Sequence, residues 1–286
     1  MKTKKDVWPI ISIVIANYNY VGSLGTAIKS VVEQEGFSQC ELIVVDGGST
    51  DGSVDIIKQF ADKIAWWVSE RDHGQSDAFN KGFAHAKGLL GCWVNADDVL
   101  LPGTLKSVID QVSTNPDVEW ITGGTVYFNN ELNIIRARIG TGITDCMHKW
   151  VDPTVIGGPS SFFSLTRLRN VGGFNEALRF TMDCDLWNKF FAAGMHLVHQ
   201  KRYFWGFRIH EGSKTSHAYF GGKAPAFLEE DSKIFRRKTY SRLGQFVRIL
   251  RLKMYKLITG AVWRSLIDSR RFQGRNLFSV FSIVQE

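Results

Sequence analysis

The sequence contains few cysteines and no long hydrophobic run. Its four cysteines form no CxxC pair, which excludes a zinc ribbon and favours a reducing compartment. No stretch reaches the about 18 consecutive apolar residues that a membrane-spanning helix needs. The lysines of the first ten residues have no apolar run behind them, so we expect no signal peptide and a cytoplasmic location. No residue type recurs with a fixed period, which excludes collagen-like and solenoid folds.

What the sequence does contain is enough apolar material for one large domain, or for one domain with an appendage. Of its 286 residues, 44% are hydrophobic and 22% are charged. The net charge of +7 is unevenly distributed, because residues 216–286 hold 14 Lys/Arg and 5 Asp/Glu, a net charge of +9. The remaining 215 residues have a net charge of −2. The basic excess therefore lies in the tail.

Along the body, β-branched runs alternate with helical patterns. The patterns predict strands at residues 10–16, 41–45, 65–68 and 90–94, and helices at 20–34, 75–86 and 103–113. Another helix should end near residue 61, with Ser49 or Thr50 as its N-cap. Two strands at 118–128 and 132–139, joined by a turn at Asn129 and Asn130, should add an antiparallel part. This alternation predicts an α/β fold whose ligands bind beyond the carboxyl ends of the strands.

Two carboxylate segments follow predicted strands in the first half of the chain. Asp46 precedes two glycines, which leave room for a ring of a ligand, although an Asp that only caps a tight turn has the same pattern. The turn lacks GxGxxG spacing, which argues against an ordinary dinucleotide site. Asp97 and Asp98 follow an apolar strand, where two ionised carboxylates repel each other unless a divalent cation screens them. The alternative is a solvated acidic turn.

Two more candidate segments occur in the second half. Asp183 and Asp185 stand among apolar residues, a setting that raises proton affinity and suits a general base. Alternatively, they are acids in the first turn of a helix, favoured by its dipole, and do no chemistry. His210 precedes Gly212 in a basic loop that could close over phosphates, and the alternative is a structural histidine.

Seven segments, taken in order, resemble glycosyltransferase family 2, the inverting nucleotide-sugar transferases of GT-A fold. The resemblance covers about residues 9–216 and rests on SIVIANYN, ELIVVDGGSTDGS, SERDHGQSDAFNKGFAHAKG, NADD, VGGFNE, DCDLW and RIHEGSKTS. It implies a GT-A catalytic domain over residues 1–220, with a Rossmann-like, mixed and mainly parallel sheet flanked by helices. A basic helical extension would follow at 221–286. The QxxRW element and membrane spans of processive synthases are absent, so one sugar per encounter is expected.

The resemblance also implies roles for individual residues. It places the nucleotide sugar at Asn17, Asn19, Asp46, Asp72, Asp77, Lys81, Asn95 and Asp97. It assigns a divalent metal, Mg²⁺ or Mn²⁺, to Asp97, Asp98 and His210. Asp183 falls at the usual position of the catalytic base, and Asp185 is the second candidate. Two departures stand out: Asn95 replaces the first Asp of the family's DxD element, and Met182 replaces the acidic residue that often precedes the base.

These assignments predict an inverting enzyme that moves one sugar from a nucleoside-diphosphate sugar to a hydroxyl acceptor. The family's common role implies bacterial surface polysaccharide synthesis, and a lipid-linked glycan would be the acceptor if the basic tail docks on a membrane. Because of Asn95 and Met182, a non-catalytic nucleotide-sugar-binding or scaffold protein remains the alternative. Slow donor hydrolysis that depends on Mg²⁺ or Mn²⁺ would separate the two.

The tail contains one amphipathic helical pattern at residues 246–261. Its apolar stripe consists of Phe246, Val247, Leu250, Met254, Leu257, Ile258 and Ala261. This stripe could pack on the body, on a second subunit of a homo-oligomer, or on the anionic inner face of the cell membrane as a peripheral protein. Nucleic-acid binding is not expected, because the basic residues alternate with Leu, Ile and Val and no recognition motif accompanies them.

Overall fold

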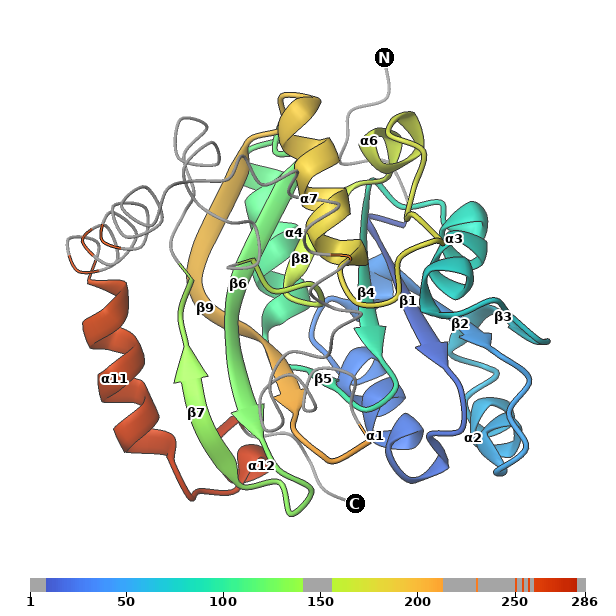
Figure 1. Ribbon diagram of the computed structural model, residues 1–286, viewed down its shortest axis with the longest axis horizontal. Coiled ribbons are helices and arrows are strands. Elements are labelled where there is room, and N and C mark those ends of the chain that lie inside the picture. The colour runs from blue at the N-terminus through green and yellow to red at the C-terminus, as the bar shows by residue number, and fades with distance from the viewer. Residues whose placement is uncertain are drawn as a thin grey trace.

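The computed structural model describes residues 9–140, 156–212 and 260–281, together with Glu230, Leu250, Met254 and Leu257. In these parts strands and helices alternate as the sequence predicts (Figure 1). The elements are β1 (Ile11–Asn17), α1 (Val21–Val32), the short 3₁₀ helix η2 (Phe37–Gln39), β2 (Cys40–Asp46), α2 (Ser53–Gln59), β3 (Ile64–Ser69), α3 (Gln75–His85), β4 (Leu90–Asn95), β5 (Val99–Leu100), α4 (Thr104–Thr114), β6 (Trp120–Phe128), β7 (Ile134–Arg138), β8 (Ser161–Ser164), α6 (Leu165–Asn170), α7 (Met182–Ala192), β9 (Leu197–Arg208), α11 (Ala261–Phe272) and α12 (Leu277–Phe281).

The described strands form one mixed sheet in the order β3-β2-β1-β4-β8-β6-β9-β5, with β7 paired to β6. Strands β3, β2, β1 and β4 are parallel to one another, and β6 is parallel to β9. Strand β8 runs antiparallel to both β4 and β6. The predicted mixed, mainly parallel sheet flanked by helices is confirmed, and its parallel half resembles a doubly wound fold.

Strand β1 is buried on both faces, which explains its uninterrupted apolar sequence. Ile13 and Ile15 point to a core formed with α1 and α4, whereas Val14 points to a second core formed with α3 and α7. This division follows the period-two alternation of a strand. Helices therefore cover both faces of the parallel half, and its strand ends are left to form a site.

The helix after β2 begins later than predicted. Helix α2 starts at Ser53 after Gly52, which adopts φ 98°, so neither Ser49 nor Thr50 is its N-cap. The hydroxyl of Ser49 instead donates a hydrogen bond to Asp46 at 2.5 Å. The Asp51 carboxylate accepts from the backbone N–H of Ser53 at 3.0 Å. The prediction of the cap was wrong because the turn uses Ser49 to bind Asp46.

The described end of the tail packs on the sheet beside β7 (Figure 1). The Ser265 hydroxyl of α11 accepts from the backbone N–H of Ile139 at 3.0 Å, and the Ser269 hydroxyl donates to the carbonyl of Ala137 at 2.9 Å. Leu277 of α12 is fully buried in a cluster that also holds Val126 of β6. Most of the predicted extension at 221–286, including its boundary at residue 220, lies outside the described residues. Among the helices that are described, none combines the length and the apolar character that membrane crossing requires.

Candidate active site

The register of the parallel strands brings four polar residues to one edge of the sheet. Asn17 of β1 is opposite Asp46 of β2, and Asp46 is opposite Ser69 of β3. On the other side of β1, Ala16 is opposite Asn95 of β4. The carboxyl ends of these strands therefore meet where an open α/β sheet places its ligand.

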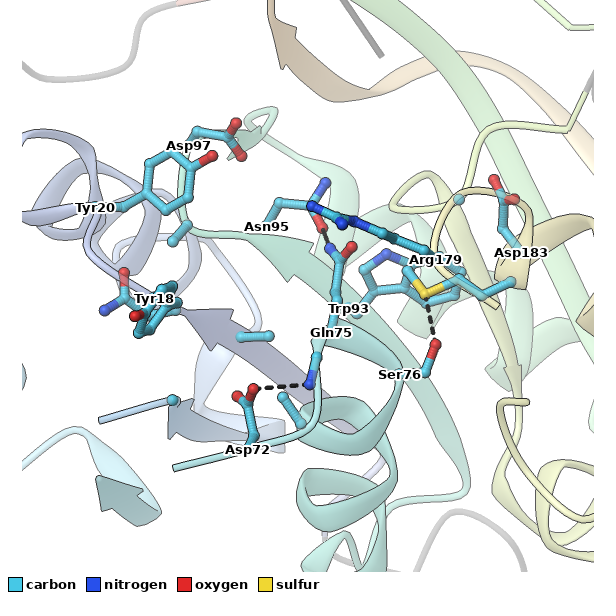
Figure 2. A pocket seen from close by; sticks show the side chains of 18 of the residues that line it. Tyr18, Tyr20, Asp72, Gln75, Ser76, Trp93, Asn95, Asp97, Arg179 and Asp183 are labelled. Carbon is cyan, nitrogen blue, oxygen red and sulfur yellow. Dashed lines mark hydrogen bonds between the residues drawn. The ribbon is translucent and has the colours of Figure 1, made fainter. Parts of the chain in front are cut away.

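A cavity of about 940 Å³ opens at this edge, bounded by the ends of β1 and β4, the segment before α3, and the segment that leads into α7 (Figure 2). Of the residues predicted from the sequence, those that line the cavity are Asn17, Asp72, Asn95, Asp97 and Asp183. Those that lie outside its lining are Asn19, Asp46, Asp77, Lys81, Asp98, Asp185 and His210. The size is typical of a site for a ligand as large as a nucleotide sugar.

Asp46 is fully buried and organises the turn behind the cavity. Its carboxylate accepts from the Asn17 amide at 2.6 Å, from the Ser69 hydroxyl at 2.6 Å, and from both the N–H and the hydroxyl of Ser49. Burial alone would raise the pKa of Asp46, but these hydrogen bonds outweigh it and hold the pKa below its ordinary value. Asn19, at φ 57°, accepts from the Thr50 N–H at 2.9 Å and so ties β1 to the same turn.

The NADD turn separates its two carboxylates. Asp98 is 1% exposed and points into the protein, where it accepts from the Asn95 amide at 2.7 Å and from the backbone N–H of Arg208 at 2.9 Å. Burial and the neighbouring Asp97 raise the pKa of Asp98 well above its ordinary value. The amide oxygen of Asn95 accepts in turn from Gln75 at 2.8 Å. The neutral Asn95 thus connects α3 to a buried acid, a position where a second carboxylate would repel Asp98.

Asp97 faces the cavity, and its Oδ2 lies 2.9 Å from Nε2 of His210. Tyr20 stands beside the pair, and burial together with the two aspartates raises the pKa of its phenol to about 12. Within the described residues no cluster of three or more His, Cys, Asp or Glu side chains could hold a metal by itself. A carboxylate and an imidazole still fit a cation that takes its remaining ligands from a diphosphate, as Mg²⁺ commonly does. The protein would supply two ligands of such a site, Asp97 and His210.

Asp183 and Asp185 both lie in the first turn of α7 but face different surroundings. Asp183 lines the cavity, and burial raises the pKa of its carboxyl even though the backbone N–H of Cys184 donates to it at 2.8 Å. Asp185 lies outside the cavity lining, and its carboxylate is 2.9 Å from the ammonium of Lys189. The helix-terminal position expected as an alternative is therefore observed for both acids, and only Asp183 also faces the cavity.

Asp77 and Lys81 support the segment before α3. The Asp77 carboxylate accepts from the backbone N–H of His73 at 2.9 Å. The ammonium of Lys81 lies 3.0 Å from Glu70 and 3.5 Å from Asp77. Burial would raise the pKa of Asp77, but the His73 hydrogen bonds and Lys81 hold it below its ordinary value. Both residues thus position the segment that carries Asp72 into the cavity.

Several lining residues were not predicted from the sequence. Tyr18, 60% exposed, lies between the two predicted asparagines and could have been found from that placement. Arg179 and Trp205 come from the segment before α7 and from β9, which reach the cavity only through the tertiary fold. Arg179 lines the same cavity as Asn95 and Asp183, and in the view of Figure 2 its side chain is drawn between those two residues.

Several relatives of this chain are described as uncharacterized glycosyltransferases. One from Nostoc sp. is 41% identical over 109 residues, which cover 37% of this chain and 33% of the relative. One from Rickettsia typhi is 28% identical over 193 residues, 64% of this chain and 58% of the relative. The chain thus spans between about a third and three fifths of the length of these curated relatives.

Solved structures share the fold at low sequence identity. The mannosyltransferase PcManGT from Pyrobaculum calidifontis, in complex with GDP-Man and Mn²⁺, has a TM-score of 0.62 at 17% identity and covers 83% of this chain and 67% of its own. Residues 1–349 of TarS from S. aureus, in complex with UDP-GlcNAc, have a TM-score of 0.59 at 17% identity and cover 73% of this chain and 61% of their own. Both support the GT-A fold. Residues 12–166, more than half of the chain, match the family described as Glycosyl transferase family 2, and the chain therefore belongs to that family.

Proposed function

We propose that this protein is an inverting glycosyltransferase that moves one sugar from a nucleoside-diphosphate sugar to a hydroxyl acceptor. The observation that carries the proposal is the cavity itself, because Asp97 and Asp183, from distant parts of the chain, line the same space. One carboxylate suits a cation-bound diphosphate and the other suits a base. Membership of the family and the donor complexes of PcManGT and TarS support the use of a nucleotide sugar.

Asp183 is the proposed general base. It would take the proton of the acceptor hydroxyl while that oxygen attacks the anomeric carbon, and the bond from this carbon to the diphosphate oxygen breaks on the opposite face. The configuration is thereby inverted. The raised pKa of Asp183 brings its proton affinity closer to that of a useful base at neutral pH. Asp185 is held by Lys189 and would instead support the first turn of α7.

A divalent cation, Mg²⁺ or Mn²⁺, is the proposed cofactor, held by Asp97 and His210. Such a cation, when bound, neutralises charge on the leaving diphosphate. Asp98, whose oxygens already accept from Asn95 and Arg208, would keep the turn in place. The Mn²⁺ complex of PcManGT supports a divalent cation in this fold.

The nucleoside would occupy the β1–β2 side of the cavity. Asn17, Tyr18 and Asp72 line that side, and Gly47 leaves room because a Cβ there would lie 2.6 Å from the Asp72 carboxylate. Asp46, Asn19, Asp77 and Lys81 would act from outside the lining by holding its turns. The exposed Tyr18 ring can stack on a base.

The acceptor is proposed to be a lipid-linked glycan in bacterial surface polysaccharide synthesis, reached at an anionic membrane. Support comes from α11, where Trp263, Leu266 and Ile267 are 60%, 50% and 64% exposed. Arg270 and Arg271 end the same helix. Of the stripe predicted at 246–261, Leu250, Met254 and Leu257 are exposed and Ala261 is buried, and its other members lie outside the described residues. A subunit contact is the alternative occupant of this surface.

The experiment for the proposed function is a donor screen by thermal shift, followed by a hydrolysis assay on the donor that binds. A ligand at ~100 times its dissociation constant should add roughly 2.7 kcal/mol of stability. The proposal expects slow release of nucleoside diphosphate that depends on Mg²⁺ or Mn²⁺ and is lost in Asp97→Ala. Binding without any hydrolysis or transfer would instead favour the non-catalytic nucleotide-sugar-binding protein.

A further inference from the structure

The segment that leads into α7 is held by a carboxylate from the C-terminal extension. Glu230 accepts from the backbone N–H of Arg179 at 2.9 Å and of Phe180 at 2.8 Å. It also accepts from the N–H and from the hydroxyl of Thr181, both at 3.2 Å. Thr181 is the N-cap residue of α7, and its own side chain makes no cap hydrogen bond. An acid from about 50 residues downstream in the chain therefore satisfies the N–H groups of the three residues that lead up to and include the N-cap of α7.

The segment held by Glu230 presents a cation to the cavity. Arg179 is exposed and lines the cavity, as Asn95, Asp97 and Asp183 do. Its guanidinium carbon lies 5.7 Å from the centre of the Phe180 ring. Among the described residues, no carboxylate forms a salt bridge with Arg179. Its charge is thus available to a ligand.

Lys81, the cation that the resemblance assigns to the nucleotide-sugar site, is placed differently. Lys81 is engaged by Glu70 and Asp77 and lies outside the lining. The diphosphate of a donor must lie between its nucleoside, near Tyr18 and Asp72, and its anomeric carbon, near Asp183. Arg179 lines the same cavity as Tyr18, Asp72 and Asp183.

We propose that Arg179 binds the diphosphate of the donor and that Glu230 is a positioning residue, which fixes the segment from which Arg179 reaches it. This inference rests on the proposed function, because it requires a nucleoside-diphosphate donor. A guanidinium can donate two parallel hydrogen bonds to phosphate oxygens, which an ammonium cannot do. The extension thereby completes the donor site.

The test compares the affinity of the protein for a nucleoside diphosphate with its affinity for the matching monophosphate, measured by calorimetry with Mn²⁺ for UDP, GDP, ADP and TDP. The ratio of the two affinities depends on contacts to the second phosphate. A loss of affinity that is common to both nucleotides leaves this ratio unchanged. Arg179→Gln should lower this ratio by about 10-fold or more, and Arg179→Lys by less. Glu230→Gln should lower it about 3-fold, and Glu230→Asp should restore part of that loss. The double variant Arg179→Gln/Glu230→Gln should be no worse than Arg179→Gln alone, because Glu230 acts through Arg179.

Two matched controls lie away from the cavity. Arg202→Gln removes an exposed arginine of β9, and Asp268→Asn alters the carboxylate of the extension that accepts from the Tyr203 hydroxyl at 2.6 Å. Both should keep the wild-type ratio within about 2-fold. A wild-type ratio in Arg179→Gln overturns the assignment of Arg179, and additive losses in the double variant overturn the positioning role of Glu230. If the wild-type protein binds none of the four diphosphates, the proposed function fails together with this inference.

Discussion

Neighbouring carboxylates of the candidate site differ in their surroundings, because their oxygens contact different partners. In the first pair, Asp98 points into the protein and accepts from Asn95 and Arg208, while Asp97 faces the cavity and His210. In the second, Asp183 lines the cavity and Asp185 contacts Lys189. Each pair thus contains one acid that can meet a ligand and one that holds the structure.

Asp97→Ala should abolish metal-dependent transfer and leave the fold intact. The side chain contributes little to the core, and its removal relieves repulsion with the buried Asp98. Turnover at saturating Mn²⁺ measures the effect on transfer, and the melting temperature measures the effect on the fold. Turnover above a tenth of the wild-type value would show that Asp97 is not a necessary ligand.

Asp183→Asn should keep donor binding and lower the transfer rate by about 10² to 10⁴, the range for loss of a positioned base. The Asn oxygen can still accept from Cys184, so the start of α7 should be preserved. Asp185→Asn is the matched control on the same helix turn, and kcat for both variants is the measurement. An equal loss in the control, with none in Asp183→Asn, would assign the base to Asp185.

The pH dependence of kcat and of stability should also depend on Asp183. Because burial raises its pKa above the ordinary 3.8, the acid limb of the kcat profile should lie above that value. The folded protein holds this proton more tightly than the unfolded chain, so stability is lost as pH rises from about 3.8 through the folded pKa. Asp183→Asn should therefore raise the melting temperature at pH 7.5 and raise it less at pH 4.5. An equal shift at both values would contradict the raised pKa.

At the scale of elements, α11 has two faces with different tasks. Ser265 and Ser269 bind the backbone next to and within β7, and Asp268 accepts from Tyr203 of β9. Trp263, Leu266 and Ile267 recur at the i, i+3, i+4 spacing and are exposed on the other face. Three large apolar side chains followed by two arginines are typical of a helix that lies in the plane of an anionic membrane.

Vesicle co-sedimentation tests this surface of α11. The full chain should bind vesicles with anionic lipid at low salt and bind neutral vesicles less. The variant Trp263→Ser/Ile267→Ser should lose most of the binding, and Arg270→Gln should weaken it about 5-fold, since each basic residue contributes about 1 kcal/mol. Val21→Ser, another exposed apolar position, is the control. If the full chain stays in the supernatant with anionic vesicles, the membrane proposal is wrong, and a dimer in light scattering would assign the surface to a second subunit.

At the scale of the whole molecule, α12 packs on strands β5, β6 and β7 of the sheet. Leu277 is fully buried in one cluster with Val99 of β5, Val126 of β6 and Ala137 of β7, so α12 completes a cluster built by three strands. Glu230 joins the extension to the segment before α7 through hydrogen bonds to backbone N–H groups. The body and the described parts of the extension should therefore unfold together.

Leu277→Ala should lower the melting temperature of a single unfolding transition. A buried Leu→Ala change costs about 2 to 5 kcal/mol, and each kcal/mol corresponds to roughly 2 to 4 °C in a protein of this size. Leu250→Ala, at a position that is 47% exposed, is the control and should change little. Calorimetry that resolves two transitions, with only one moved by Leu277→Ala, would show instead that the extension unfolds independently.

Local pattern was enough to predict the parallel half of the fold. Strands β1, β2 and β4 begin and end within about one residue of the prediction, because a strand buried on both faces is a continuous apolar run between turn residues. Strands β5, β8 and β9 were missed, because their short or aromatic segments are strands only through pairing with distant partners. Arg179 and Trp205 were not predicted as cavity residues for the same reason, because only contacts between distant segments bring them to the cavity.

The sequence by itself determined the family and predicted the strand ends and the carboxylates of the candidate site. Those features depend on residue type and spacing, which a linear chain already contains. Only the tertiary structure decided which acid of each pair faces the cavity, that Lys81 is engaged by Glu70 of the segment after β3, and that Glu230 reaches the segment before α7. These outcomes depend on burial and on contacts between segments far apart in the chain, and neither quantity exists until the sheet and its helices are packed.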